Sequence, residues 1–85
     1  MSKILMRALA DILYQTRREL GLSQEKMAEK RCKSYREYND LENAKRLPSI
    51  QTFIDIIITC DLNVNLIIQT LIERGYIPND DRNSA

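Results

Sequence analysis

The fold is decided by residues 21–42, which read GLSQEKMAEKRCKSYREYNDLE. Ser23 can cap a short helix over about residues 24–31, because its hydroxyl can accept from a free backbone N–H group. Ser34 can cap a second helix, which runs to about Ala44. Two short helices on a two-residue connection predict a helix-turn-helix, whose second helix can be presented to the major groove of DNA.

The ends of these helices carry further local signals. Gly21 favours a Schellman-type end to the helix before it, since a positive φ is least costly for glycine. Leu22 and Met27 are spaced as a hydrophobic staple, and Ser34 with Glu37 has the spacing of a capping box. These signals place the end of the first helix at Gly21 and the starts of the next two helices at Ser23 and Ser34.

Three more helices are predicted around this pair. A first covers about Lys3–Leu20, a fourth about residues 50–60 and a fifth about residues 64–74, with Ser49 and Asn63 as caps of the last two. The residues expected to face the core are Leu5, Leu9, Ile12, Leu13 and Leu20 of the first helix and Phe53, Ile54 and Ile57 of the fourth. No hairpin signal or repeat is present, so the prediction is an all-α domain of five helices.

The charge is unevenly distributed along the 85 residues. Residues 1–46 hold 11 Lys and Arg against 7 Asp and Glu, whereas residues 47–85 hold 2 against 5, and the net charge of the whole chain is only +1. The basic half contains the predicted helix-turn-helix, and the segment Lys26–Arg36 alone has five basic residues against Glu29. Such an excess suits a surface that faces a polyanion.

The composition argues against several classes of function. The chain has no His, only two Cys (Cys32 and Cys60) and two Gly, so we expect no catalytic base of the commonest kind, no metal site, no phosphate-binding glycine loop and no cofactor. Neither a secretory signal nor a run of apolar residues long enough for a membrane is seen, which favours a cytoplasmic protein that is not an enzyme. We expect one domain over residues 1–78 and a flexible tail over residues 79–85.

Two segments together resemble the Cro/C1-type (XRE) family of helix-turn-helix DNA-binding domains. They are GLSQEKMA at residues 21–28 and LENAKRLPS at residues 41–49, and they fit the family's spacing without a gap. The resemblance implies a five-helix, lambda-repressor-like domain that binds operator DNA, usually as a homodimer. It also implies an ion pair between Arg17 and Glu42 that ties the first helix to the third.

The same resemblance, with the helical geometry, assigns the candidate DNA-binding residues. Arg36, Asp40 and Asn43 lie opposite the expected core face of the third helix, which carries Tyr38 and Leu41. Arg36 has the fork that reads guanine, and Asn39 can pair with adenine. The full set of candidates is Gln24, Lys33, Ser34, Tyr35, Arg36, Asn39, Asp40, Asn43 and Lys45.

The sequence departs from the family's pattern at three places. The turn reads Arg31-Cys32-Lys33-Ser34 where the family has an apolar-Gly-apolar-Ser pattern, and Ala44 replaces a usual Gly. Glu37 and Asp40 add negative charge on or beside the reading helix. These changes fit either an altered turn that still binds DNA or a domain that has moved away from DNA.

Apolar residues cover more of the fourth and fifth helices than one inward stripe needs. This excess predicts an exposed apolar surface and a homodimer interface, formed by Ile56, Ile58, Leu66, Tyr76 and Ile77. Two functions remain open: a DNA-binding transcription regulator that acts as a homodimer on double-stranded DNA, and a protein-interaction module, such as an antitoxin or regulator subunit, whose apolar surface binds a protein partner.

Overall fold

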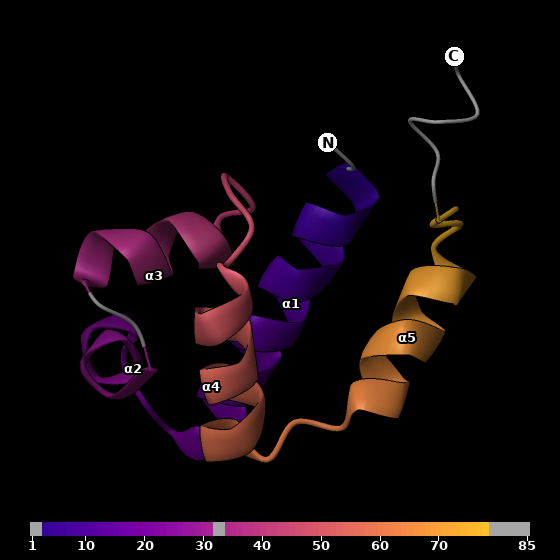
Figure 1. Ribbon diagram of the computed structural model, residues 1–85. Helices are drawn as coiled ribbons and strands as arrows, with labels where there is room; N and C mark the ends of the chain where they lie inside the picture. Colours follow the sequence, from indigo (N-terminus) through magenta and orange to yellow (C-terminus); the bar gives the residue numbers. More distant parts are fainter. Residues whose placement is uncertain (1–2, 32–33, 79–85) are drawn as a thin grey trace.

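The computed structural model describes residues 3–31 and 34–78. This part of the chain forms five helices and no strand: α1 (Lys3–Leu20), α2 (Gln24–Arg31), α3 (Tyr35–Glu42), α4 (Ile50–Cys60) and α5 (Val64–Glu73) (Figure 1). The all-α prediction is confirmed. The third and fifth helices end at Glu42 and Glu73, a little earlier than predicted. The turn residues Cys32 and Lys33 and the predicted tail 79–85 lie outside the described residues.

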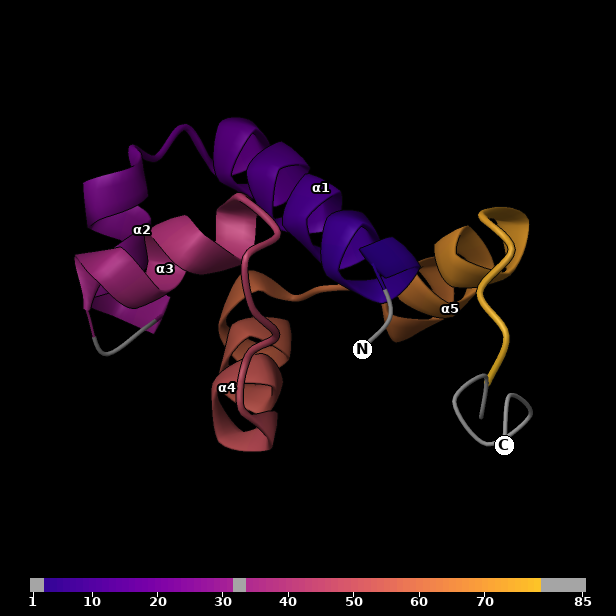
Figure 2. The same cartoon turned by 90° about the horizontal axis from the view of Figure 1, so that it is seen from above.

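The long helix α1 organises the other four. Figure 2 shows α2 and α3 beside the C-terminal half of α1, α5 beside its N-terminal half, and α4 between them on one side. The contacts agree with this view, because α1 packs on α3 and α5 while α2 packs on α3 and α4. The helix-turn-helix pair and α5 therefore lie at opposite ends of the molecule.

Within residues 3–31 and 34–78 the core contains three small buried clusters. Ala8 of α1 packs with Ile67 and Leu71 of α5, while Leu13 of α1 packs with Leu41 of α3 and Ile56 of α4. The third cluster, Met27, Ala28 and Tyr38, joins α2 to α3. Leu22 packs on this third cluster, as the predicted staple requires. The helix-turn-helix thus has its own apolar contact as well as its attachment to α1.

The predicted caps are formed in the structure. The hydroxyls of Ser23, Ser34 and Ser49 each accept from the backbone N–H three residues later, at 3.1 Å in all three cases. Asn63 Oδ1 accepts from two N–H groups at the start of α5. At the end of α1, Gly21 has φ +70°, with the two reversed hydrogen bonds of a Schellman motif. Local sequence signals therefore set most of the helix boundaries.

The buried face of α4 differs from the prediction. Ile56 is 1% exposed and lies in the core, so the prediction that it faces a partner is wrong. Ile54, expected in the core, is 45% exposed. The two residues are two positions apart, about 200° around a helix, and cannot share one face. Leu20, the last residue of α1, is also exposed rather than in the core.

Ala44 adopts a left-handed backbone conformation in the turn after α3, with φ +59°. Its N–H donates to Leu41 O, and the N–H of Lys45 donates to Asp40 O at 2.9 Å, the same pattern as at Gly21. A residue with a Cβ atom pays about 1–2 kcal/mol for this conformation. The left-handed turn after α3 is therefore formed although alanine, rather than glycine, occupies it.

We expect Ala44→Gly to stabilise the fold by about 0.5–1 kcal/mol, because the relief of strain exceeds the added freedom of the unfolded chain. Urea unfolding followed by circular dichroism measures the change. The same substitution in the middle of α1, Ala10→Gly, is the control and should lower stability. A loss of stability in Ala44→Gly would contradict this account of the turn.

No single helix in residues 3–31 and 34–78 is long and apolar enough to cross a membrane. The helices α4 and α5 reach the required length and composition only when they are taken together, and a bend of 116° separates them.

Candidate nucleic-acid interface

The helix-turn-helix presents the outer face of α3 to solvent. Tyr38 is fully buried against α2, and this contact turns the other side of α3 outward. Tyr35, Arg36 and Asn43 are exposed on that side, while Asn39 and Asp40 are half-buried beside them. Of the other predicted DNA-binding residues, Ser34 caps α3, Gln24 begins α2, and Lys45 is exposed in the turn after α3. Lys33 lies outside the described residues. The predicted structural residues Arg17 and Glu42 form an ion pair in the interior.

The predicted ion pair between Arg17 and Glu42 is confirmed and is bidentate. Arg17 Nε donates to Glu42 Oε2 and the terminal nitrogen NH2 donates to Oε1, both at 2.9 Å. The other terminal nitrogen donates to the carbonyl of Leu22 at 3.0 Å. The guanidinium therefore ties α1 both to α3 and to the entry of α2. The hydrogen bond to Glu42 raises the pKa of Arg17.

Glu42 accepts more hydrogen bonds than the ion pair supplies. Tyr38 donates its hydroxyl to Oε2 at 2.5 Å, and Gln24 donates Nε2 to Oε1 at 3.0 Å. Burial by itself would raise the pKa of this carboxyl, but the hydrogen bonds from Arg17, Tyr38 and Gln24 outweigh it and hold the pKa below its usual value. Glu42 is 8% exposed and stays ionised.

The lowered pKa of Glu42 predicts acid sensitivity. The charged carboxylate stabilises the fold above its unfolded-state pKa, about 4.3, and this contribution disappears as pH falls through the lower folded-state value. We expect the difference in unfolding free energy between the wild type and Glu42→Gln to be full at pH 7 and to shrink below about pH 4. Urea titrations between pH 7 and 3 measure it, and a difference that does not change with pH would contradict the assignment.

A second set of hydrogen bonds joins Gln24 to the outer face of α3. Its Oε1 accepts from the Tyr35 hydroxyl at 3.1 Å and from Asn39 Nδ2 at 3.3 Å. Asn43 Nδ2 in turn donates to Asn39 Oδ1 at 3.1 Å and to the Asn39 carbonyl at 2.9 Å. Four of the predicted DNA-binding residues are therefore connected to one another and, through Gln24, to Glu42.

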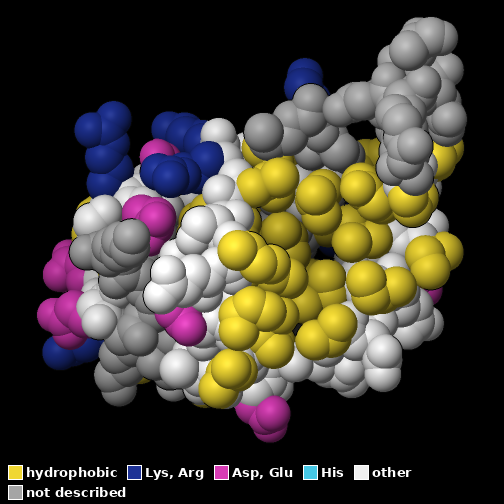
Figure 3. Space-filling view, in the orientation of Figure 1, with side chains coloured by type: hydrophobic (Ala, Val, Ile, Leu, Met, Phe, Trp, Pro, Cys, Tyr) yellow, Lys and Arg dark blue, Asp and Glu magenta, His cyan; other side chains and the backbone are white. Residues whose placement is uncertain are grey.

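The charged side chains around α3 favour an anion. In the part of the chain that the structure describes, neither Arg36 nor Lys45 has an ion pair, and both are exposed. The side chain of Glu37 is 14% exposed, and its carboxylate lies 4.0 Å from the guanidinium of Arg46. Arg46 thus reduces the repulsion that Glu37 was expected to cause. Figure 3 shows Lys and Arg side chains beside α3, well separated from the apolar face of the molecule.

The contacts of two residues in this region were not predicted from the sequence. Tyr38 was expected only as a core residue, although its spacing of four from Glu42 puts their side chains on one helix face and allowed the hydrogen bond to be foreseen. Arg46 is nine residues from Glu37, and no local pattern indicates that they meet.

The opposite end of the molecule carries an exposed apolar face over α4 and α5 (Figure 3). Of the predicted interface residues, Ile58 is 72% exposed, Ile77 57% and Leu66 54%. Tyr76 is half-buried, because it packs against the cluster of Ala8, Ile67 and Leu71. The other exposed large apolar residues of α4 and α5, which the prediction did not include, are Ile50, Ile54, Val64, Ile68 and Ile72.

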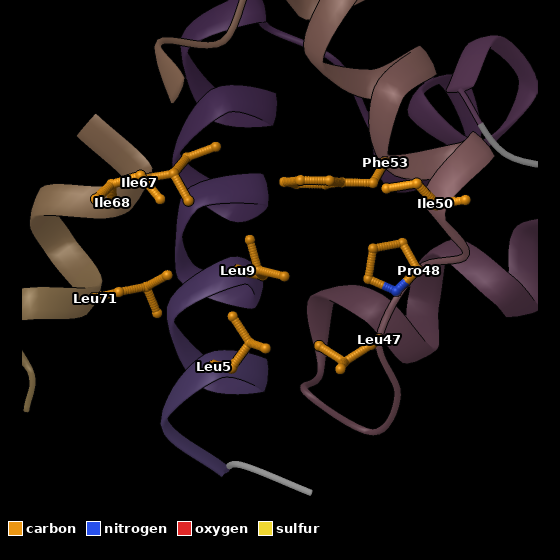
Figure 4. Close-up of a pocket in the computed structure, with 9 residues that line it drawn as sticks. All are labelled: Leu5, Leu9, Leu47, Pro48, Ile50, Phe53, Ile67, Ile68 and Leu71. Atoms are coloured by element: carbon orange, nitrogen blue, oxygen red, sulfur yellow. The ribbon is translucent and has the colours of Figure 1, made fainter. Parts of the chain in front are cut away.

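This apolar face contains a groove between α4 and α5. Figure 4 shows Ile68 of α5 on one side, Phe53 of α4 on the other, and Leu5 and Leu9 of α1 at the back. The groove has a volume of about 320 Å³ and also includes Pro48 in its lining. A surface of this kind is typical of a protein–protein contact.

In a comparison with protein families, a model described as helix-turn-helix matches residues 13–67. The match begins in the second half of α1, includes the whole of α2, α3 and α4, and ends in α5. Comparisons with curated proteins and with solved structures give no match.

Proposed function

The chain belongs to the Cro/C1-type helix-turn-helix family, whose domain indicates DNA binding and transcription regulation, and from this premise we propose that it binds operator DNA as a homodimer through α3. Domains of this family are typically not enzymes. The helix α3 enters the major groove, and two copies read the two halves of a pseudo-palindrome about 34 Å apart.

The observation that carries the proposal is the exposed face of α3, held in place from behind. The cluster of Met27, Ala28 and Tyr38 and the bidentate pair of Arg17 with Glu42 fix α3 on α2 and α1. A reading helix with a fixed orientation loses little entropy when it binds, which favours affinity. The residue types on its outer face, an arginine and two asparagines, are those that read guanine and adenine in the major groove.

The predicted contacts divide into two kinds. We assign Arg36, Asn39 and Asp40 to base edges, where Asp40 can accept from the amino group of cytosine. We assign the remaining positions to the sugar-phosphate backbone: Gln24, Lys33, Ser34, Tyr35, Asn43 and Lys45. Ser34 and Gln24 stand at helix N-termini, where the dipole of the backbone favours phosphate.

We assign dimerisation to the apolar face of α4 and α5. Ile58 of α4, Leu66 of α5 and Ile77 after α5 are exposed, and apolar side chains are costly to leave in water. The apolar face lies apart from the Lys and Arg side chains beside α3 (Figure 3), so two copies can associate through it and still leave both reading helices free.

Arg36→Ala tests the assignment of α3. We expect it to reduce the preference for the best duplex over a shuffled one by about 10-fold, because a bidentate contact to guanine contributes about 1–3 kcal/mol of discrimination. Lys45→Ala is the matched control: it should weaken binding to both duplexes by a similar factor, since a phosphate contact carries no sequence information. Fluorescence anisotropy with both duplexes gives the ratio, and equal ratios in all three proteins would contradict the assignment.

The groove between α4 and α5 supports a second candidate, a module that binds a protein partner through the apolar face. Sedimentation of the pure protein, combined with a DNA-binding assay, distinguishes between these two candidate functions. A stable two-copy species that binds duplex DNA supports the first function. A monomer that fails to bind DNA and co-purifies with a second protein in stoichiometric amount supports the second.

A further inference from the structure

A chain of hydrogen bonds runs from the buried ion pair to the outer face of α3. It passes from Glu42 to Gln24, from Gln24 to Asn39, and from Asn39 to Asn43, over distances of 3.0, 3.3 and 3.1 Å. Its members come from α2 and α3 and include the turn after α3. These hydrogen bonds therefore connect the buried carboxylate of Glu42 with the side chain of Asn43, which is exposed where a ligand on α3 can contact it.

The buried end gives this chain a direction. An ionised carboxylate can only accept hydrogen bonds, so Gln24 must turn its amino group toward Glu42. The two ends of an amide point opposite ways, and Gln24 Oε1 is therefore directed to α3. There it accepts from the hydroxyl of Tyr35 as well as from Asn39.

The same argument orients Asn39. Since Gln24 offers an acceptor, Asn39 must present Nδ2 to it, and Asn39 Oδ1 then faces the donor of Asn43. The amide of Asn39 is held at both ends. It keeps one N–H and one oxygen lone pair outside these bonds.

One donor and one acceptor on a single amide match adenine in the major groove. Adenine offers N7 as an acceptor and its N6 amino group as a donor, whereas guanine offers two acceptors, N7 and O6. A side-chain amide that is free to rotate can form one hydrogen bond with either adenine or guanine. An amide whose direction is fixed, with one donor and one acceptor presented, matches adenine only.

We propose that Glu42, acting through Gln24, fixes the direction of the Asn39 amide, and that Asn39 held in this way selects adenine at one position of each half-site. Gln24 is then a positioning residue for base selection, in addition to any contact with phosphate. The inference rests on the proposed function, because it requires that α3 enters the major groove.

The test compares Gln24→Met with the wild-type chain on duplexes selected from a randomised pool. Methionine keeps the length of the side chain but offers no amide. We expect the wild type to prefer adenine about 10-fold at one position of each half-site, and Asn39→Ala to lose this preference. Gln24→Met loses its contact with phosphate and should bind every duplex more weakly, but its preference for adenine should fall below about threefold, which loss of a phosphate contact alone does not cause.

A duplex with 7-deazaadenine at that position gives a second readout, which a general loss of stability does not produce. This base lacks N7, so it should weaken wild-type binding and leave the affinity of Gln24→Met nearly unchanged. The matched control is Gln15→Met on α1, which is exposed and should respond as the wild type does. Thermal melts ensure that all variants are folded at the temperature of the binding assay.

Three outcomes would overturn the inference, and each excludes a different part of it. Full adenine preference in folded Gln24→Met would exclude the positioning role alone. An adenine preference that survives Asn39→Ala would exclude Asn39 as the selecting residue. A wild-type chain that binds no duplex from the pool would remove the proposed function as well.

Discussion

Arg17→Met is expected to lower the free energy of unfolding by about 3–5 kcal/mol, since it leaves the carboxylate of Glu42 buried without its counter-ion. The side chain of Glu42 is only 5% exposed, so water cannot replace the lost partner. Domains of this size have about 5–15 kcal/mol in total, and a loss of this magnitude lowers Tm by at least about 12 °C. Calorimetry and urea unfolding measure it.

Two controls separate this explanation from a general effect of losing an arginine. Arg18→Met removes the neighbouring guanidinium, which is exposed and bonded to the Tyr14 hydroxyl at 2.8 Å, and it should cost less than about 1 kcal/mol. The double variant Arg17→Met/Glu42→Gln removes both charges and keeps an amide oxygen for Tyr38, so it should recover much of the loss. Equal losses in Arg17→Met and Arg18→Met would contradict a buried pair.

Ile58→Asp is expected to weaken binding to a two-half-site duplex by about 10²- to 10⁴-fold, because it converts a dimer with two linked contacts into separate monomers. Ile58 is 72% exposed, so the substitution removes little from the core and the monomer should unfold at nearly the same urea concentration. At a two-fold interface each carboxylate would be transferred from water into an apolar contact, which is strongly unfavourable.

The control for this prediction is Ile58→Leu, which keeps an apolar side chain of equal volume. It should sediment and bind DNA as the wild type does. An unchanged mass and affinity in Ile58→Asp would show that this face does not form the dimer.

Much of the fold could be predicted because its signals are local. The serine caps at the starts of α2, α3 and α4 and the glycine after α1 each act over three or four residues, and all are formed as expected. The pair of Arg17 and Glu42 is not local; it could be expected only from the resemblance to a family.

The features that could not be predicted from the sequence depend on which face each helix turns toward its neighbours. In α4 every position from Ile54 to Ile58 except Asp55 is isoleucine, so composition cannot tell which side is buried. The contact with Leu13 and Leu41 decides in favour of Ile56. Likewise, the hydrogen bonds that join Gln24 to Asn39 exist only once α2 has packed on α3.

The central claim, that α3 binds duplex DNA as part of a dimer, is tested most directly by the salt dependence of binding to the best duplex from a randomised pool. With about three phosphates neutralised by each subunit, the slope of log Kobs against log salt concentration should be about −5 between 50 and 200 mM. The complex should contain two copies of the chain. A slope near zero, or no binding to any duplex at 50 mM salt, would contradict the claim.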